Sequence, residues 1–209
     1  MEPREQRLTA LLAIAAGYAL IMITVWSPRP VQRWLFWVDA AFFLCAAVLA
    51  FREMPFELPP LEFTLVIVGL GIAIAGSVMF IAAELGTLHH LFGARRPLLH
   101  ASMYLAWAIV QQWIQQSFFF IRLERLLHRG ILASFTAAAM FGLVHLPNPV
   151  LAPVTFLGGW ILSEVYRRYR SVLPLGIAHG LVGLAIALSV PDQINHHMRV
   201  GLGYLMYRG

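Results

Sequence analysis

The stretch Gln111-Gln112-Trp113-Ile114-Gln115-Gln116 decides how the chain can fold, because it places four carboxamides inside an apolar run at 99–121. At the 3.6-residue period of an α-helix, the four glutamines fall on one helix face. An amide that faces lipid without a hydrogen-bond partner loses about 2–7 kcal/mol. The stretch therefore predicts a membrane helix whose glutamine face points into the protein, toward other polar groups or a wet cavity.

The composition is typical of a polytopic membrane protein. Of the 209 residues, 60% are hydrophobic and 12% are charged, and the mean hydropathy is +0.74. These values exclude an ordinary soluble globule. The net charge of +5 comes from arginines in short clusters beside apolar runs, a pattern typical of topology signals at lipid headgroups. We therefore expect the lipid bilayer, and no nucleic acid, as a partner.

Seven apolar segments are candidate spans, since crossing ~30 Å of hydrocarbon takes ~20 apolar residues. They are 8–26, 34–51, 63–83, 99–121, 131–146, 150–166 and 172–190, followed by a short amphipathic tail at 194–209. The Pro147-Asn148-Pro149 break allows only a tight turn, so the two segments beside it should be antiparallel. The sequence predicts an all-α membrane helical bundle of about seven or eight transmembrane helices around a polar central cavity.

The order of these segments suggests a division of the chain. We expect supporting helices at 1–98, a core that carries the chemistry at 99–190 and a tail at 191–209. The first apolar run is interpreted as a retained span, because no small-residue cleavage site follows it. Nine of the 15 arginines fall on the side of the N-terminus, which favours a cytoplasmic N-terminus. We expect a multi-pass protein of a bacterial cytoplasmic membrane.

Some charged groups have plain structural interpretations. Asp39 is expected at the membrane interface or beside an arginine, with a relay carboxylate as the alternative. Glu164 is expected to pair with Arg168 four residues later, with an inward-facing carboxylate as the alternative. Around the connection before 99–121 we expect a solvated loop rather than a metal site, although it holds Glu84, His89, His90 and His100.

Two histidines lie on the later apolar segments. His145 follows Phe141 by four residues, and His179 precedes Gly183 by four residues. At a rise of ~1.5 Å per residue, Gln112, His145 and His179 reach depths of roughly 15, 21 and 10 Å from the arginine-rich side. We expect the three to line one cavity. A metal held by the two histidines is an incomplete alternative, since zinc usually takes three protein ligands.

These residues resemble the CPBP (CAAX protease and bacteriocin-processing) or Abi family, which includes the type II CAAX prenyl endopeptidases and the lysostaphin-resistance-protein-A-like proteins. The family pattern is Glu-Glu-x-x-x-Arg, then Phe-x-x-x-His, then His-x-x-x-Asn/Asp, on successive helices. The resemblance extends over about half of the chain, from 99 to 190. Phe141 and His145 match the second motif, and His179 matches the head of the third.

The chain departs from the family pattern at four positions. The two Glu places hold Gln111 and Gln112, the Arg place holds Gln116, and the Asn/Asp place holds Gly183. Gln keeps the length and hydrogen bonding of Glu but cannot take a proton from water. A buried guanidinium without its carboxylate would cost about 3–5 kcal/mol. The replacement of both the Glu and the Arg of the first motif by Gln is therefore physically consistent. We interpret the site as re-tuned to a neutral one.

The resemblance implies an intramembrane endopeptidase that hydrolyses a membrane-tethered or lipidated peptide, without metal or cofactor. We expect His145 to activate water, with Gln111, Gln112 or Gln116 as oxyanion donors. The expected catalytic residues are His145, His179, Gln112 and Gln111, and the expected substrate-binding residues are Gln115, Gln116, Phe141 and Gly183. Three alternatives stay open. They are an inactive homologue that binds or scaffolds an apolar lipid, prenyl chain or membrane protein, acid–base chemistry on a lipid, and polar packing without catalysis.

Overall fold

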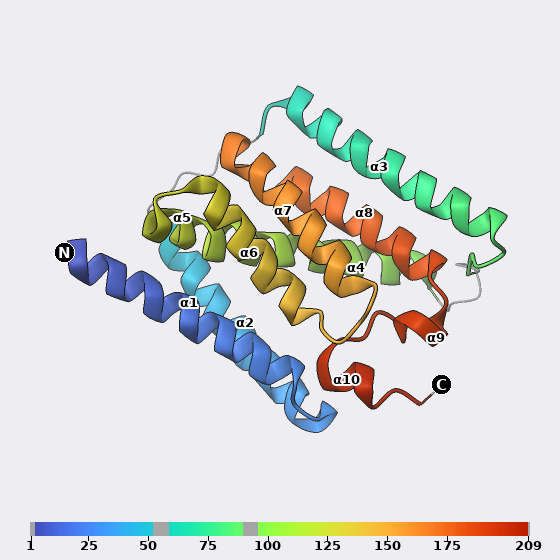
Figure 1. Cartoon of the computed structure of the whole chain (residues 1–209), viewed down its shortest axis with the longest axis horizontal. Helices are drawn as coiled ribbons and strands as arrows, with labels where there is room; N and C mark the ends of the chain where they lie inside the picture. The colour runs from blue at the N-terminus through green and yellow to red at the C-terminus, as the bar shows by residue number, and fades with distance from the viewer. Residues whose placement is uncertain (1–2, 52–58, 90–95, 209) are drawn as a thin grey trace.

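A computed structural model describes residues 3–51, 59–89 and 96–208, and the described chain forms a helical bundle (Figure 1). The helices are α1 (Pro3–Val25), α2 (Arg29–Phe51), α3 (Leu61–Glu84), α4 (Pro97–Gln112), η2 (Trp113–Phe120), α5 (Ile121–Leu127), α6 (Gly130–Val144), α7 (Leu151–Tyr169), α8 (Leu173–Ser189), α9 (Asp192–Asn195) and α10 (Gly201–Leu205). The predicted all-α architecture is confirmed. Arg52 and Arg95, which entered the arginine count, and His90 lie outside the described residues.

The N-terminal helices have the length and surface of membrane spans. Arg4–Val25, Arg29–Leu49 and Leu61–Glu84 are long and apolar enough to cross a bilayer, and α6 and α8 are shorter apolar helices. Large apolar side chains on α2 and α3 point outward, and Trp34, Trp37 and Leu70 are each more than half exposed. So much exposed apolar surface is typical of a face that contacts lipid. The protein is an integral membrane protein.

The long helices pack in an order that brings α4 and α8 to the centre. α3 lies along α8 at one edge of the bundle, and α1 and α2 form a hairpin at the opposite edge (Figure 1). Between them, α6 packs against α7, and α4 packs against α8. A Cβ added to Gly176 of α8 would lie 2.7 Å from Cα of Ile109 on α4. Small residues thus let α8 approach its neighbours closely, as is common in membrane bundles.

The predicted span at 99–121 belongs to a continuous helical stretch in which a π-helix, η2, lies between α4 and α5. At its end, the Ile121 amide donates to the carbonyl of Gln116, five residues earlier. Such interruptions are rare and often occur at functional sites. Phe118 and Phe119 pack against Phe43 of α2, whereas Phe120 contacts Tyr166 of α7. η2 therefore joins the N-terminal hairpin to the core.

The predicted amphipathic tail consists of two short helices, α9 and α10, and Asn148 holds it to the bundle. The buried Asn148 donates from Nδ2 to O and Oδ1 of Asn195, at 2.9 and 3.0 Å, and to O of Arg199, at 3.0 Å. Its Oδ1 accepts from the amides of Val150 and Leu151 at the start of α7, at 3.0 and 2.9 Å. One side chain thus caps α7 and fixes the tail.

Candidate functional site

A cavity of about 1190 Å³ lies within the bundle, walled by α1, α2, α3, α4, η2, α6, α7 and α8. Its wall is mostly apolar. The residues that line it include seven of the eight predicted site residues, namely Gln111, Gln112, Gln115, Phe141, His145, His179 and Gly183. The eighth, Gln116, is fully buried and lies behind this wall.

The glutamines form a hydrogen-bonded network with His179. Nε2 of Gln112 donates to Oε1 of Gln115 at 3.2 Å and lies 3.1 Å from Nδ1 of His179. Nε2 of Gln115 donates to the backbone oxygen of Gly159 at 3.3 Å. Nε2 of Gln116 donates to Oε1 of Gln112 at 3.1 Å. The glutamine face points into the protein and reaches α7 and α8.

The Gly159 carbonyl sets the direction of the whole network, because a carbonyl oxygen can only accept. Gln115 must therefore turn its amide nitrogen toward Gly159 and its Oε1 toward Gln112. Gln112 then has to donate to Gln115 with one N–H and to Nδ1 of His179 with the other. With Nδ1 of His179 as an acceptor, the ring proton of this imidazole is on Nε2.

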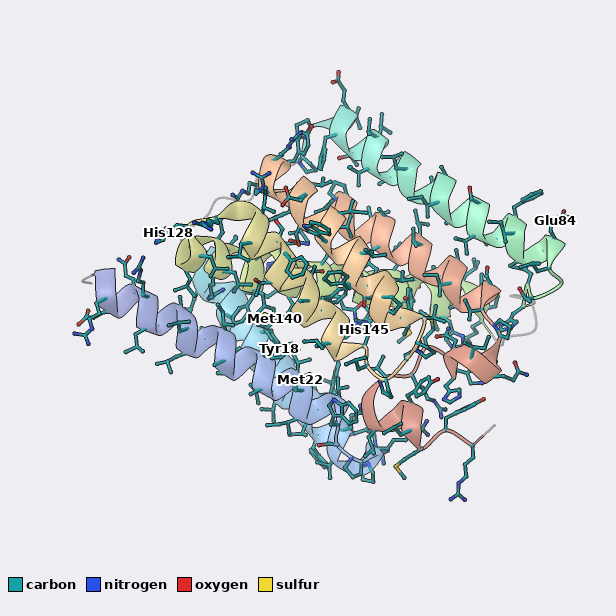
Figure 2. The ribbon with its side chains drawn as sticks, in the orientation of Figure 1. Tyr18, Met22, Glu84, His128, Met140 and His145 are labelled. Atoms are coloured by element: carbon teal, nitrogen blue, oxygen red, sulfur yellow. The ribbon has the colours of Figure 1, made fainter. Side chains whose placement is uncertain are left out.

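His145 has the opposite tautomer. It lies at the C-terminal end of α6 (Figure 2) and is 8% exposed. Its Nδ1 is 2.7 Å from the backbone oxygen of Phe141, so Nδ1 carries the proton and Nε2 keeps a lone pair. The Phe141 ring lies edge-on to both imidazoles, with centroids 4.8 Å from His145 and 5.7 Å from His179. The cavity wall thus holds one imidazole that can accept a proton and one that can donate a hydrogen bond.

The network leaves few amide donors for a ligand. Both N–H groups of Gln112 are used, and Gln116 does not reach the wall. This geometry argues against Gln112 and Gln116 as the expected oxyanion donors. Gln115 has one N–H beyond its bond to Gly159, and Gln111 is half-buried on the wall. Gln112 instead donates to Nδ1 of His179, a contact that fits the tautomer with its proton on Nε2.

The family model described as type II CAAX prenyl endopeptidase Rce1-like matches residues 93–185. This segment is Rce1-like. The predicted resemblance to the CAAX protease family is confirmed for a part of the chain that contains all eight predicted site residues. The Rce1-like segment covers a little under half of the chain, and α1 to α3 lie outside it. No curated protein and no solved structure matches the chain.

In the described part of the chain, Asp39 and Glu164 do not have the arginine partners that the sequence suggested. Asp39, outside the Rce1-like segment, lines the cavity and has one buried carboxylate oxygen without a hydrogen-bond partner. Among the described residues no arginine pairs with Asp39, so the expected arginine partner is not found there, and the interfacial and relay interpretations stay predictions. Glu164, inside the segment, pairs with Arg167 at 2.7 Å and not with Arg168. The cavity wall does not include Glu164.

The described residues hold no group of three His, Cys, Asp or Glu side chains placed to bind a metal ion. Among these described residues, His145 and His179 have no third His, Cys, Asp or Glu beside them that could complete a metal site. His89 lies in a loop and donates its backbone amide to the carbonyl of Leu188 at 2.7 Å.

Sequence reasoning missed Tyr104, which lines the cavity from α4 at the start of the Rce1-like segment. It precedes Gln111 and Gln112 by seven and eight residues, a spacing that puts all three on one helix face. A Cβ added to Gly183 of α8 would overlap the Tyr104 hydroxyl. The helical spacing was a usable signal for Tyr104, but its contact with α8 required the tertiary structure.

Proposed function

We propose that the protein is an intramembrane endopeptidase that hydrolyses a membrane-tethered or lipidated peptide, with water activated by His145. The observation that carries this proposal is the pair of opposite tautomers, His145 and His179, on one cavity within an Rce1-like segment. A general base and a hydrogen-bond donor are the two groups that attack of water on an amide requires.

In this mechanism, Nε2 of His145 takes a proton from water as the water oxygen bonds to the carbonyl carbon of the scissile amide. Nε2–H of His179 donates to the carbonyl oxygen, which becomes an oxyanion. The protonated His145 then returns its proton to the amine nitrogen as the C–N bond breaks. Gln112 keeps His179 in the donating tautomer. A positioned base of this kind accelerates a reaction by about 10²–10⁴-fold.

The shape and lining of the cavity support an amphipathic substrate. A mostly apolar volume of about 1190 Å³ suits a lipid or prenyl chain, and the polar groups gather where α4, α6 and α8 meet. A peptide attached to such a chain would bring its amide to the imidazoles. We propose a bacterial inner membrane as the setting of this reaction, and the arginine distribution supports a cytoplasmic N-terminus there.

The test uses the purified full chain in liposomes with an internally quenched peptide that carries a farnesylated cysteine. His145→Asn keeps an amide that can donate to the Phe141 carbonyl but removes the base. We expect it to lower kcat by about 10²-fold or more. His100→Asn is the matched control, because His100 is exposed and lies off the cavity wall. Cleavage by His145→Asn at the wild-type rate would exclude the mechanism.

The neutral network favours one second candidate, an inactive homologue that binds an apolar lipid, a prenyl chain or a membrane protein. Asp39 is the one Asp or Glu on the described cavity wall, and it lies outside the Rce1-like segment. The double variant Gln112→Glu with Gln116→Arg separates the two candidates. If it cleaves the farnesylated peptide and the wild type does not, the native protein is a binding protein.

A further inference from the structure

Two hydrogen-bond donors on the cavity wall, the Gln112 amide and the Tyr104 hydroxyl, differ in whether the described part of the chain uses them. The Tyr104 hydroxyl makes no hydrogen bond to any described residue, although Tyr104 lies on the cavity wall. By contrast, both N–H groups of Gln112 are spent on Gln115 and His179. A phenol is a hydrogen-bond donor at neutral pH. Tyr104 can therefore donate to a ligand without breaking a bond inside the protein.

The place of this hydroxyl is defined by Gly183. A Cβ at position 183 would overlap the Tyr104 hydroxyl and would lie 3.0 Å from both Cε1 and Cζ of its ring. The phenol thus fills the space into which a side chain at position 183 would project. Gly183 follows His179 by one helical turn, so both positions face the same side of α8. The Tyr104 hydroxyl is thereby held one turn along α8 from the imidazole that donates from Nε2.

We propose that Tyr104 is a catalytic hydrogen-bond donor that binds the scissile carbonyl oxygen together with Nε2–H of His179. This inference rests on the proposed peptidase function and adds the second donor of the oxyanion site. The hydroxyl donates to the carbonyl oxygen and stays protonated, while the proton cycle between water, His145 and the leaving amine is unchanged. Gly183 is required because any larger residue would displace the phenol.

The first test is Tyr104→Phe in the farnesylated-peptide assay, because Phe keeps the packing of the ring and loses only the hydroxyl. Removing one oxyanion donor lowers kcat by about 10²–10³-fold, and we expect KM to stay within a few-fold of the wild type. Tyr169→Phe is the matched control, since Tyr169 is exposed and off the cavity wall. Thermal unfolding of Tyr104→Phe should match that of the wild type.

The second test uses position 183. Gly183→Ala should lower kcat as much as Tyr104→Phe does, because its methyl group displaces the hydroxyl. The double variant should lose little more than either single variant, since both remove the same interaction. Gly183→Asn combined with Tyr104→Ala should recover part of the kcat that Tyr104→Ala loses, because an amide donor enters the space that the ring leaves.

The outcomes separate this inference from the proposed function. A Tyr104→Phe protein within threefold of the wild-type kcat, alongside an inactive His145→Asn protein, would show that Tyr104 only packs and would leave the peptidase mechanism intact. Wild-type cleavage by both variants would overturn both proposals. A wild-type protein that cleaves no farnesylated peptide would also overturn both.

Discussion

The backbone oxygen of Gly159 lies 3.3 Å from Nε2 of Gln115, and this contact joins α7 to the glutamine network. It fixes which end of each amide faces its neighbour, and through Gln112 it fixes the tautomer of His179. The state of an imidazole on α8 therefore depends on a carbonyl on α7. Such a connected and satisfied polar network is expected to hold one arrangement of a buried site.

Gly159→Ala should break this connection. Its Cβ would lie 2.7 Å from Nε2 of Gln115, so the amide must move. We expect a loss of stability of about 1–3 kcal/mol, as is typical of overpacking, and a kcat at least tenfold lower. Gly158→Ala is the stability control, because a Cβ at Gly158 has no neighbour within 4 Å. Thermal unfolding in detergent checks the pair, and equal stability of the two variants would contradict the prediction.

Asn148→Asp should release the C-terminal tail without removing the cap of α7. The carboxylate still accepts from Val150 and Leu151, but it cannot donate to Asn195 or Arg199. Leaving buried acceptors without a donor costs about 1–3 kcal/mol. We expect faster tryptic cleavage after Arg199 than in the wild type. An unchanged cleavage rate would mean that other contacts hold the tail.

Gly71→Ala should weaken the contact between α3 and α8. A Cβ at Gly71 would lie 2.9 Å from both Cα and Cβ of Ala178, so the two helices must separate. The expected cost is about 1–3 kcal/mol. Gly69→Ala and Gly76→Ala serve as controls on the same helix, since neither position has a neighbour within 4 Å. They should stabilise α3 by about 0.5–1 kcal/mol, and chemical unfolding in mixed micelles measures the difference.

Glu164→Gln should leave peptidase activity within about twofold of the wild type. Glu164 lies off the cavity wall and pairs with Arg167, with about a third of each side chain exposed. A partly exposed pair of this kind contributes about 0–1 kcal/mol. Activity in the farnesylated-peptide assay and thermal unfolding check both parts. A loss of kcat comparable to that of His145→Asn would place this carboxylate in the reaction.

The sequence predicted the parts of the site that depend on helical spacing. Apolar runs located the helices, and three of the helices that the structure describes are long and apolar enough to cross a membrane. The motif residues Phe141, His145 and His179 lie on one cavity. The partner of Glu164 was wrong by one residue, because positions three and four apart both lie close on a helix. The bond from Gln115 to Gly159 and the contact of Tyr104 with Gly183 join separate helices, so no local pattern specifies them.

The π-helix η2 also constrains how this chain can vary. Removing one residue of η2 at 117–119 would rotate everything after the deletion relative to α4, by about 100° where the chain continues as an α-helix. Phe120 would turn away from Tyr166, and the amides before it would keep their place. A substitution in η2 therefore changes only the side chain at that position. An insertion or deletion in η2 rotates the helix that follows it relative to the helix that precedes it.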